Sequence, residues 1–115
     1  MKRVLVIDED TRLLAKIWQA LTEAGMRVDI DRLGNDALES VAAVAYDVAV
    51  VGMRLPGLDG VSLCREMRRA KIATPVLMLI NANGNDPVGV PPEVDDHLEK
   101  PVAIDEVVAR VQALA

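Results

Sequence analysis

Short apolar runs alternate with helical patterns along the whole chain, and this alternation most constrains the fold. The run from Val4 to Ile7 is continuous, rich in β-branched residues and followed by three acids, which is typical of a strand buried on both faces of a parallel sheet. Four further strands are predicted at 26–30, 46–51 and 75–80, and around His97 and Leu98. Strands separated by helices pair in parallel through right-handed crossovers. We therefore predict an α/β fold, a doubly wound five-stranded parallel sheet with helices on both faces.

Apolar side chains at helical spacing mark the segments between these strands. The first helix is expected behind a cap at Asp10 or Thr11 and ahead of a stop at Gly25. A type II turn over Leu55 to Leu58 precedes a third helix capped by Asp59. The predicted apolar stripes are Leu14, Ile17, Trp18 and Leu21; Ala37, Leu38, Val41 and Val44, within 35–44; Val61, Cys64 and Met67; and Val107, Val108, Val111 and Leu114, in a helix from about Ile104.

The segment 81–94 interrupts this pattern. It holds Pro87, Pro91 and Pro92 together with two glycines, and no stretch between them is long enough for a stable helix. We expect the fourth helix to be shortened or replaced by a Pro/Gly-rich loop. Because a doubly wound sheet needs cover on both faces, we predict that the loop folds back with Val88 and Val90 as plugs, the alternative being cover by a partner.

Composition excludes several classes of protein. With 115 residues, 51% of them hydrophobic, the chain can build one compact core, and we expect a single domain over 1–115. A single cysteine excludes a disulfide framework and a cysteine-rich zinc site. No apolar run approaches the ~20 residues that span a bilayer, so we expect a cytoplasmic protein with no membrane contact. The net charge of −5 opposes the phosphate backbone, which predicts no direct binding of nucleic acid.

The carboxyl ends of the predicted strands carry the chemistry, as in other open sheets of this kind. Asp8, Glu9 and Asp10 follow the first strand, and Lys100 follows the fifth. With the motifs Tyr46-Asp47, Leu55-Pro56-Gly57-Leu58-Asp59-Gly60, Thr74-Pro75-Val76-Leu77-Met78-Leu79 and Lys100-Pro101, the chain resembles a response-regulator receiver domain of the CheY type. The resemblance runs nearly end to end and implies the strand order 2-1-3-4-5.

The resemblance also implies a phosphorylation site, which this sequence lacks in part. In the family, a carboxylate ending the third strand accepts a phosphoryl group, an acidic pair holds Mg²⁺, and a hydroxyl and a lysine grip the phosphoryl oxygens. Asp8 and Glu9 match the acidic pair and Lys100 the lysine. The acceptor position is Gly52 and the hydroxyl position is Ile80, neither of which can do that chemistry. We therefore expect a pseudo-receiver without a cofactor, with at most weak Mg²⁺ binding at Asp8 and Glu9.

A residual acidic pocket is expected at the same edge. Neighbouring carboxylates repel unless a cation approaches, so Lys100, and less strongly Arg54, are predicted to face Asp8, Glu9 and Asp10. In that case Lys100→Ala should lower stability by about 1 kcal/mol or somewhat more. A simpler interpretation makes the acids a solvated turn and a helix cap, with Lys100 as their counter-ion.

His97 replaces the aromatic residue that follows activation in the family, so it marks the switch position, although a histidine there is more often an ordinary edge-strand residue. Cys64, on an amphipathic helix, is expected to be a packed thiol.

Two functions remain open. In the first, a non-enzymatic signalling module docks a protein partner, or its own effector domain, through the fifth strand and last helix, as a monomer or weak dimer. The last helix resembles that of receivers fused to winged-helix DNA-binding domains, which implies the regulatory part of a transcription regulator; a stand-alone adapter fits equally. In the second, a non-standard carboxylate such as Asp10 accepts the phosphoryl group. An enzyme is not supported, because the chain has no glycine-rich phosphate loop and no pairing of nucleophile and base.

Overall fold

The computed structural model describes residues 1–81 and 90–115, and strand and helix alternate along the chain from β1 to β4. The strands are β1 (Arg3–Ile7), β2 (Arg27–Asp31), β3 (Val48–Gly52), β4 (Val76–Asn81) and β5 (Asp96–Lys100). The helices are α1 (Thr11–Glu23), α2 (Gly34–Ala43), α3 (Gly60–Arg69) and α4 (Ile104–Leu114).

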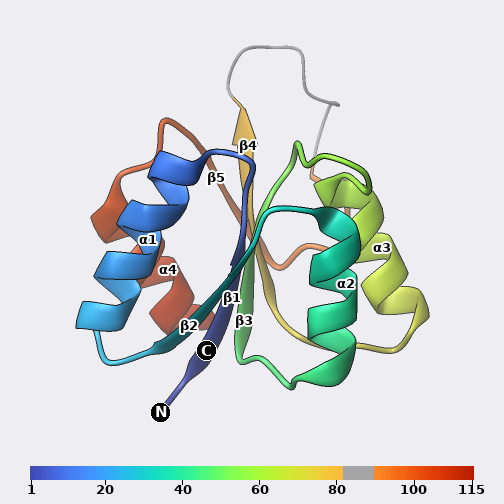
Figure 1. Ribbon diagram of the computed structural model, residues 1–115, viewed down its shortest axis with the longest axis horizontal. Helices are drawn as coiled ribbons and strands as arrows, with labels where there is room; N and C mark the ends of the chain where they lie inside the picture. The colour runs from blue at the N-terminus through green and yellow to red at the C-terminus, as the bar shows by residue number, and fades with distance from the viewer. Residues whose placement is uncertain (82–89) are drawn as a thin grey trace.

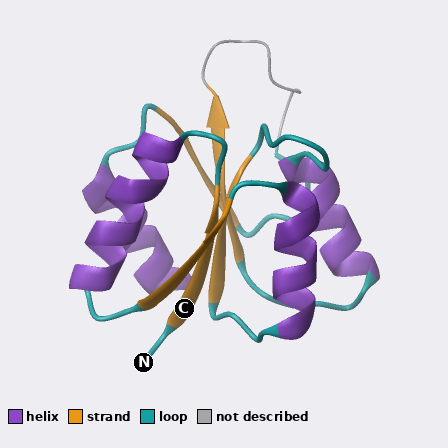
Figure 2. Cartoon of the chain, viewed as in Figure 1, coloured by secondary structure: helices purple, strands orange, loops and turns teal. Residues whose placement is uncertain are grey.

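The strands form one parallel sheet in the order β2-β1-β3-β4-β5. Helices α1 and α4 cover one face of this sheet, and α2 and α3 cover the other (Figures 1 and 2). The doubly wound sheet and the strand order predicted from the sequence are therefore confirmed. The register pairs Gly52 with Leu79 and Asn81 with Lys100, so the carboxyl ends of the three strands meet at one edge.

Burial follows the strand order. The side chains of β1 from Val4 to Ile7 and of β3 from Val48 to Val51 are fully buried, as expected for central strands with helices on both faces. The alternation of side chains divides the core into two clusters. One lies under α1 and α4 and includes Val6, Val50, Leu79, Ile17 and Val111; the other lies under α2 and α3 and includes Leu5, Val51, Met78, Leu63 and Met67.

The N-termini of α1 and α3 show the capping predicted from the sequence. The Asp10 side chain accepts hydrogen bonds from the backbone N–H groups of Arg12 at 3.0 Å and Leu13 at 3.2 Å, which makes Asp10 the N-cap of α1. Asp59 caps α3 in the same way, through Ser62 N at 2.9 Å. In the predicted turn before α3, Gly57 has φ +75°, the value that a type II turn requires at this position.

Three details of the sequence interpretation are wrong. Trp18 was expected on the apolar stripe of α1, but it is 44% exposed. Successive helical residues are rotated by about 100°, so Trp18 stands on the flank of a face whose buried residues are Leu14, Ile17 and Leu21. Val44 does not continue α2 but forms its C-cap with extended backbone, and β3 begins at Val48 rather than at Tyr46.

The connection between β4 and β5 is described in part. Residues 90–95 contain no helix, in agreement with a fourth helix that is shortened or replaced. Val90 is partly buried, and Val94 packs against the core cluster under α2 and α3. Val88, the other predicted plug, lies outside the described residues, so the fold-back of this loop stays a prediction. In the part of the chain that the structure describes, no helix has both the length and the apolarity to cross a membrane.

Candidate functional site

The site at the carboxyl ends of the strands is centred on one buried acid. Asp8 directly follows β1 and is fully buried. The ammonium of Lys100 lies 2.8 Å from Asp8 Oδ2 and donates a hydrogen bond to Asp8 Oδ1 at 3.1 Å. The backbone N–H of Asp10 donates to the same Oδ1 at 2.9 Å. Both carboxylate oxygens of Asp8 therefore face the positively charged ammonium of Lys100, and Oδ1 also accepts a hydrogen bond from the backbone.

Lys100 reaches this acid from a strand that does not touch β1. In the sheet, β3 and β4 lie between β1 and β5, so the pair joins residues 92 positions apart across the sheet edge. The lysine side chain is 23% exposed, whereas the Asp8 side chain is at 0%. A charge pair with one partner wholly withdrawn from water depends strongly on its geometry, because the unpaired acid would be costly to bury.

The carboxylate of Asp8 occupies the space above Gly52. A Cβ atom at Gly52 would lie 2.5 Å from Asp8 Oδ2, 3.0 Å from Asp8 Cγ and 3.4 Å from the carbonyl oxygen of Ile7. The first of these distances is shorter than non-bonded heavy atoms tolerate. The present position of Asp8 therefore requires that residue 52 carry no side chain.

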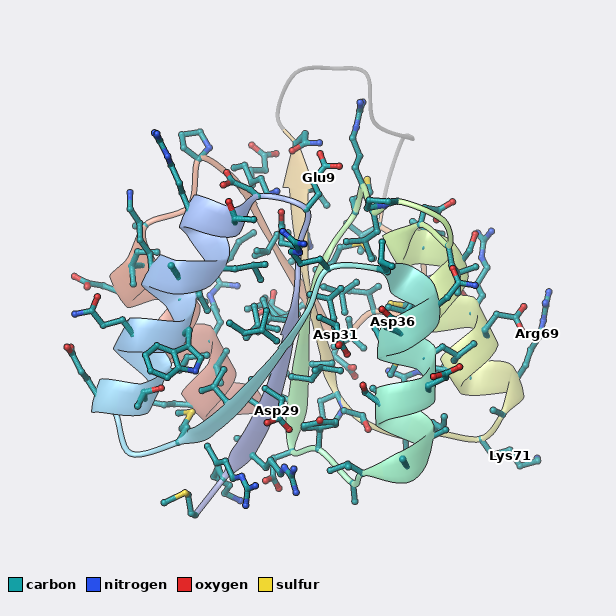
Figure 3. The ribbon with its side chains drawn as sticks, viewed as in Figure 1. Glu9, Asp29, Asp31, Asp36, Arg69 and Lys71 are labelled. Carbon is teal, nitrogen blue, oxygen red and sulfur yellow. The ribbon has the colours of Figure 1, made fainter. Side chains whose placement is uncertain are left out.

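The other predicted members of the acidic pocket do not share this environment. Glu9 is exposed, and Figure 3 shows it at the carboxyl-end edge of the sheet. Asp10 is exposed and caps α1 through Oδ1. Arg54 is exposed on the loop after β3. Among these acids, the expected ion pair with Lys100 forms at Asp8.

The remaining side chains do not fit the Mg²⁺ ion that the family resemblance implies. Mg²⁺ needs near-octahedral oxygen coordination, usually with one or two carboxylates. Here the carboxylate of Asp8 faces an ammonium, and Gly52 offers no side-chain ligand. Within residues 1–81 and 90–115, no group of three His, Cys, Asp or Glu side chains is placed to hold a metal ion.

Three further predicted residues have plain environments. Ile80, at the hydroxyl position, is partly buried and packs against the core under α2 and α3. His97 is exposed in the middle of β5, opposite Met78 in the strand register. Cys64 is fully buried, and this burial raises its pKa to about 12, which keeps the thiol protonated and unreactive at neutral pH.

The sequence interpretation missed Arg68, which ties α3 to the residues just before β5. Its guanidinium donates to the carbonyl oxygens of Ile72 at 2.7 Å, Thr74 at 3.0 Å and Glu93 at 3.0 and 3.2 Å, and to Asp95 Oδ2 at 3.2 Å. We call this set of contacts the Arg68 clamp. The only sequence signal for it is an arginine in the last turn of α3, which is also typical of an ordinary favourable charge at a helix end.

A second arginine connects β5 to the last helix. Arg110 Nη1 donates to both carboxylate oxygens of Asp96, at 2.8 and 2.9 Å, and its Nε donates to Glu106 at 3.0 Å. The hydrogen bond from Arg110 lowers the pKa of Asp96 below its usual value of 3.8. This pair fixes the strand and helix that were predicted to form the docking surface.

Known proteins match this chain over nearly its full length. The response regulator receiver domain family matches residues 4–112. The transcriptional regulatory protein TcrA of Mycobacterium tuberculosis is 38% identical over 98% of this chain and 46% of that protein. The response regulator MprA of Mycobacterium avium is 32% identical over 97% of this chain and 50% of that protein. The chain thus spans about half the length of these curated relatives.

Solved structures agree with the sequence matches. The receiver domain of the Francisella response regulator 1452 superposes with a TM-score of 0.91 at 34% identity, covering 99% of this chain and 96% of that one. The response regulator TrrA of Thermotoga maritima, solved in complex with Mg²⁺ and BeF, superposes with a TM-score of 0.88 at 25% identity, and both chains are covered completely.

Proposed function

The chain belongs to the response regulator receiver domain family, and we propose that within it this chain is a pseudo-receiver, which signals through protein contacts rather than by accepting a phosphoryl group. The contacts are made with a protein partner or with an effector domain of the same polypeptide, through β5 and α4. We propose no enzymatic activity for it.

The observation that carries this proposal is the position of Asp8 over Gly52. Phosphoryl transfer needs an acceptor atom in line with the donor and positive charge around the transferred oxygens. Position 52 has no acceptor atom, and the Asp8 carboxylate fills the space where one would stand. Lys100, the cation available for a phosphoryl group, lies 2.8 Å from that carboxylate.

The alternative acceptor, Asp10, is less well supported. Its Oδ1 accepts hydrogen bonds from two backbone N–H groups at the start of α1, and phosphorylation of the carboxylate would weaken this cap. The ammonium of Lys100 is directed at Asp8 instead. We therefore favour signalling without phosphoryl transfer over a non-standard acceptor.

The curated relatives support a place in transcription regulation. TcrA and MprA are named as a transcriptional regulatory protein and a response regulator, and the chain spans about half of each. We propose that this chain is the regulatory part of such a regulator, and that DNA contact belongs to another part, because a net charge of −5 disfavours binding to phosphates here.

Intact-mass spectrometry after incubation with acetyl phosphate and Mg²⁺ tests the proposal. The expected result is an unchanged mass for the wild-type chain and for the Asp10→Asn variant. A Mg²⁺-dependent gain of one phosphoryl group in the wild type would contradict the proposal, and loss of that adduct in Asp10→Asn would establish the alternative acceptor.

A further inference from the structure

An open groove of about 690 Å³ lies beside the Asp8–Lys100 pair, between the first turns of α1 and the segment that leads from β5 into α4. Leu13, Val102 and Ile104 contribute apolar side chains to it, and Arg12 and Lys16 contribute cations. Lys100 also lines the groove, at the side of the buried acid. The volume falls in the range of sites that bind small molecules, roughly 300–1,000 Å³.

The charge of this groove differs from that of the whole chain. Arg12 and Lys16 lie one helical turn apart, both are exposed, and neither has a carboxylate partner among the residues that the structure describes. Asp10 also lines the groove, but its Oδ1 is directed to the backbone of α1. Carboxylates do pair with other arginines of the chain, namely Arg3, Arg65, Arg68, Arg69 and Arg110.

The apolar part of the groove is continuous with the core. Leu13, Val102 and Ile104 are partly buried and pack on one side against the cluster under α1 and α4. Their remaining surface faces the groove, next to the cations of Arg12 and Lys16. A surface that joins an apolar floor to a cationic rim is complementary to a molecule with an apolar body and an anionic head.

We propose that this groove binds a small amphipathic anion, with a carboxylate or phosphate head between Arg12 and Lys16 and an aliphatic or aromatic body over Leu13, Val102 and Ile104. The inference rests on the proposed function for its role in signalling. Lys100 lines this groove and also pairs with Asp8, so the groove adjoins the Asp8–Lys100 pair. A ligand in the groove thereby acts at the carboxyl-end edge of the sheet, where the family resemblance implies a phosphorylation site. Its binding involves no covalent step.

The test is a titration of the ¹⁵N-labelled chain with octanoate, 1-octanol and inorganic phosphate, followed by backbone amide shifts. Octanoate should move the amides of Leu13, Lys16 and Val102 and bind at least about fivefold more tightly than octanol, because two cations face its head. Hexanoate should bind more weakly, by up to about fourfold for each methylene removed. Phosphate alone should bind more weakly than octanoate, because it lacks an apolar body.

Paired variants locate the site. Arg12→Gln with Lys16→Gln should lower octanoate affinity about tenfold. Lys2→Gln with Arg32→Gln removes the same charge from exposed positions outside the groove and should leave the affinity unchanged. Three results would overturn the inference: the same loss of octanoate affinity in both double variants, octanol binding as tightly as octanoate, or no octanoate binding up to about 10 mM.

Two controls are needed. The first distinguishes a free ligand from a lipid surface, and the second distinguishes an error in the proposed ligand binding from an error in the proposed function. Cosedimentation of the chain with phosphatidylglycerol vesicles would assign the groove to a lipid surface and contradict a free ligand. A phosphoryl adduct with acetyl phosphate would contradict the proposed function while leaving octanoate binding intact, whereas a silent titration would contradict only the groove.

Discussion

The two ends of β5 are anchored by different kinds of contact. At the carboxyl end, Lys100 forms one ion pair with an acid that has no exposure to water. At the amino end, the Arg68 clamp donates two hydrogen bonds to the carbonyl oxygen of Glu93 and one to Asp95 Oδ2. Its other two hydrogen bonds go to the carbonyl oxygens of Ile72 and Thr74, just before β4. The first anchor depends on one fully buried carboxylate, whereas the second is spread over part-buried backbone carbonyls and one exposed carboxylate, that of Asp95.

Each anchor lies beside a position at which the family resemblance implies a departure from the receiver pattern. The pair of Lys100 and Asp8 lies over Gly52, the position to which the resemblance assigns the acceptor. The Arg68 clamp holds the segment before β5, where the expected fourth helix is shortened or replaced. The buried carboxylate of Asp8 is paired with Lys100, because an unpaired buried charge is costly, whereas the segment just before β5 is held by hydrogen bonds to a part-buried backbone carbonyl, that of Glu93.

The largest effect is expected at the carboxyl end. Lys100→Met should lower the free energy of unfolding by about 3 kcal/mol, because it leaves a fully buried carboxylate without its partner. The sequence predicted about 1 kcal/mol or somewhat more for Lys100→Ala on the basis of partial burial, and the larger value is expected because the structure buries Asp8 completely. Urea denaturation measures it, with Lys16→Met as the control, expected within about 0.5 kcal/mol of wild type. If Lys100→Met lowers the free energy of unfolding no more than Lys16→Met does, the carboxyl-end anchor is not the stronger of the two.

Breaking the Arg68 clamp should have a smaller effect. Arg68→Ala leaves the carbonyls of Ile72, Thr74 and Glu93 without this donor and should cost about 2 kcal/mol. Amide exchange at Val76, which donates to Asp95 Oδ2 at 2.7 Å, should accelerate.

Arg69→Ala is the matched control for the clamp. This neighbour projects outward from α3 and pairs only with Glu66 of its own helix among the described residues (Figure 3). Its loss should cost less than about 0.5 kcal/mol. Equal costs for Arg68 and Arg69 would show that the clamp contributes nothing beyond a surface charge.

Gly52→Ala tests whether the first anchor needs an empty position 52. Its Cβ would lie 2.5 Å from Asp8 Oδ2, so Asp8 must move and its pair with Lys100 must weaken. We expect a cost of about 1–2 kcal/mol in urea denaturation. In the Lys100→Met background the same change should cost less, because the pair is already gone. Strict additivity of the two changes would contradict the coupling.

The smallest effect is expected at the Asp96–Arg110 pair. The pKa of Asp96 is lowered, so this pair stabilises the fold above the usual value of 3.8 and its contribution is lost as the pH falls through the lowered pKa. Arg110→Gln should therefore raise the pKa of Asp96, measured by carboxyl NMR titration. It should destabilise slightly at about pH 6, and this cost should shrink as the pH falls through the lowered pKa of Asp96. An unchanged pKa would mean that Arg110 does not hold the carboxylate in solution.

The residues that the sequence interpretation placed correctly are those governed by local rules. The apolar run of β1, the stripe of Leu14, Ile17 and Leu21, and the cap at Asp59 depend only on spacing and on neighbouring backbone groups. Trp18 shows the limit of such rules. Its spacing fits the apolar stripe of α1, but the width of the helix face that is buried depends on the sheet against which the helix packs.

The sequence by itself determined the order of strands and helices, and it located Gly52 and Ile80 at strand ends where the family resemblance places an acceptor and a hydroxyl. Only the tertiary structure decided that Asp8 is buried while Glu9 is exposed, and that Arg68 reaches the chain at Glu93 and Asp95. Periodicity reports which face of an element is apolar over a few residues. Contacts between residues 25 to 92 positions apart depend instead on sheet register and on the space that neighbouring side chains leave, which no local pattern encodes.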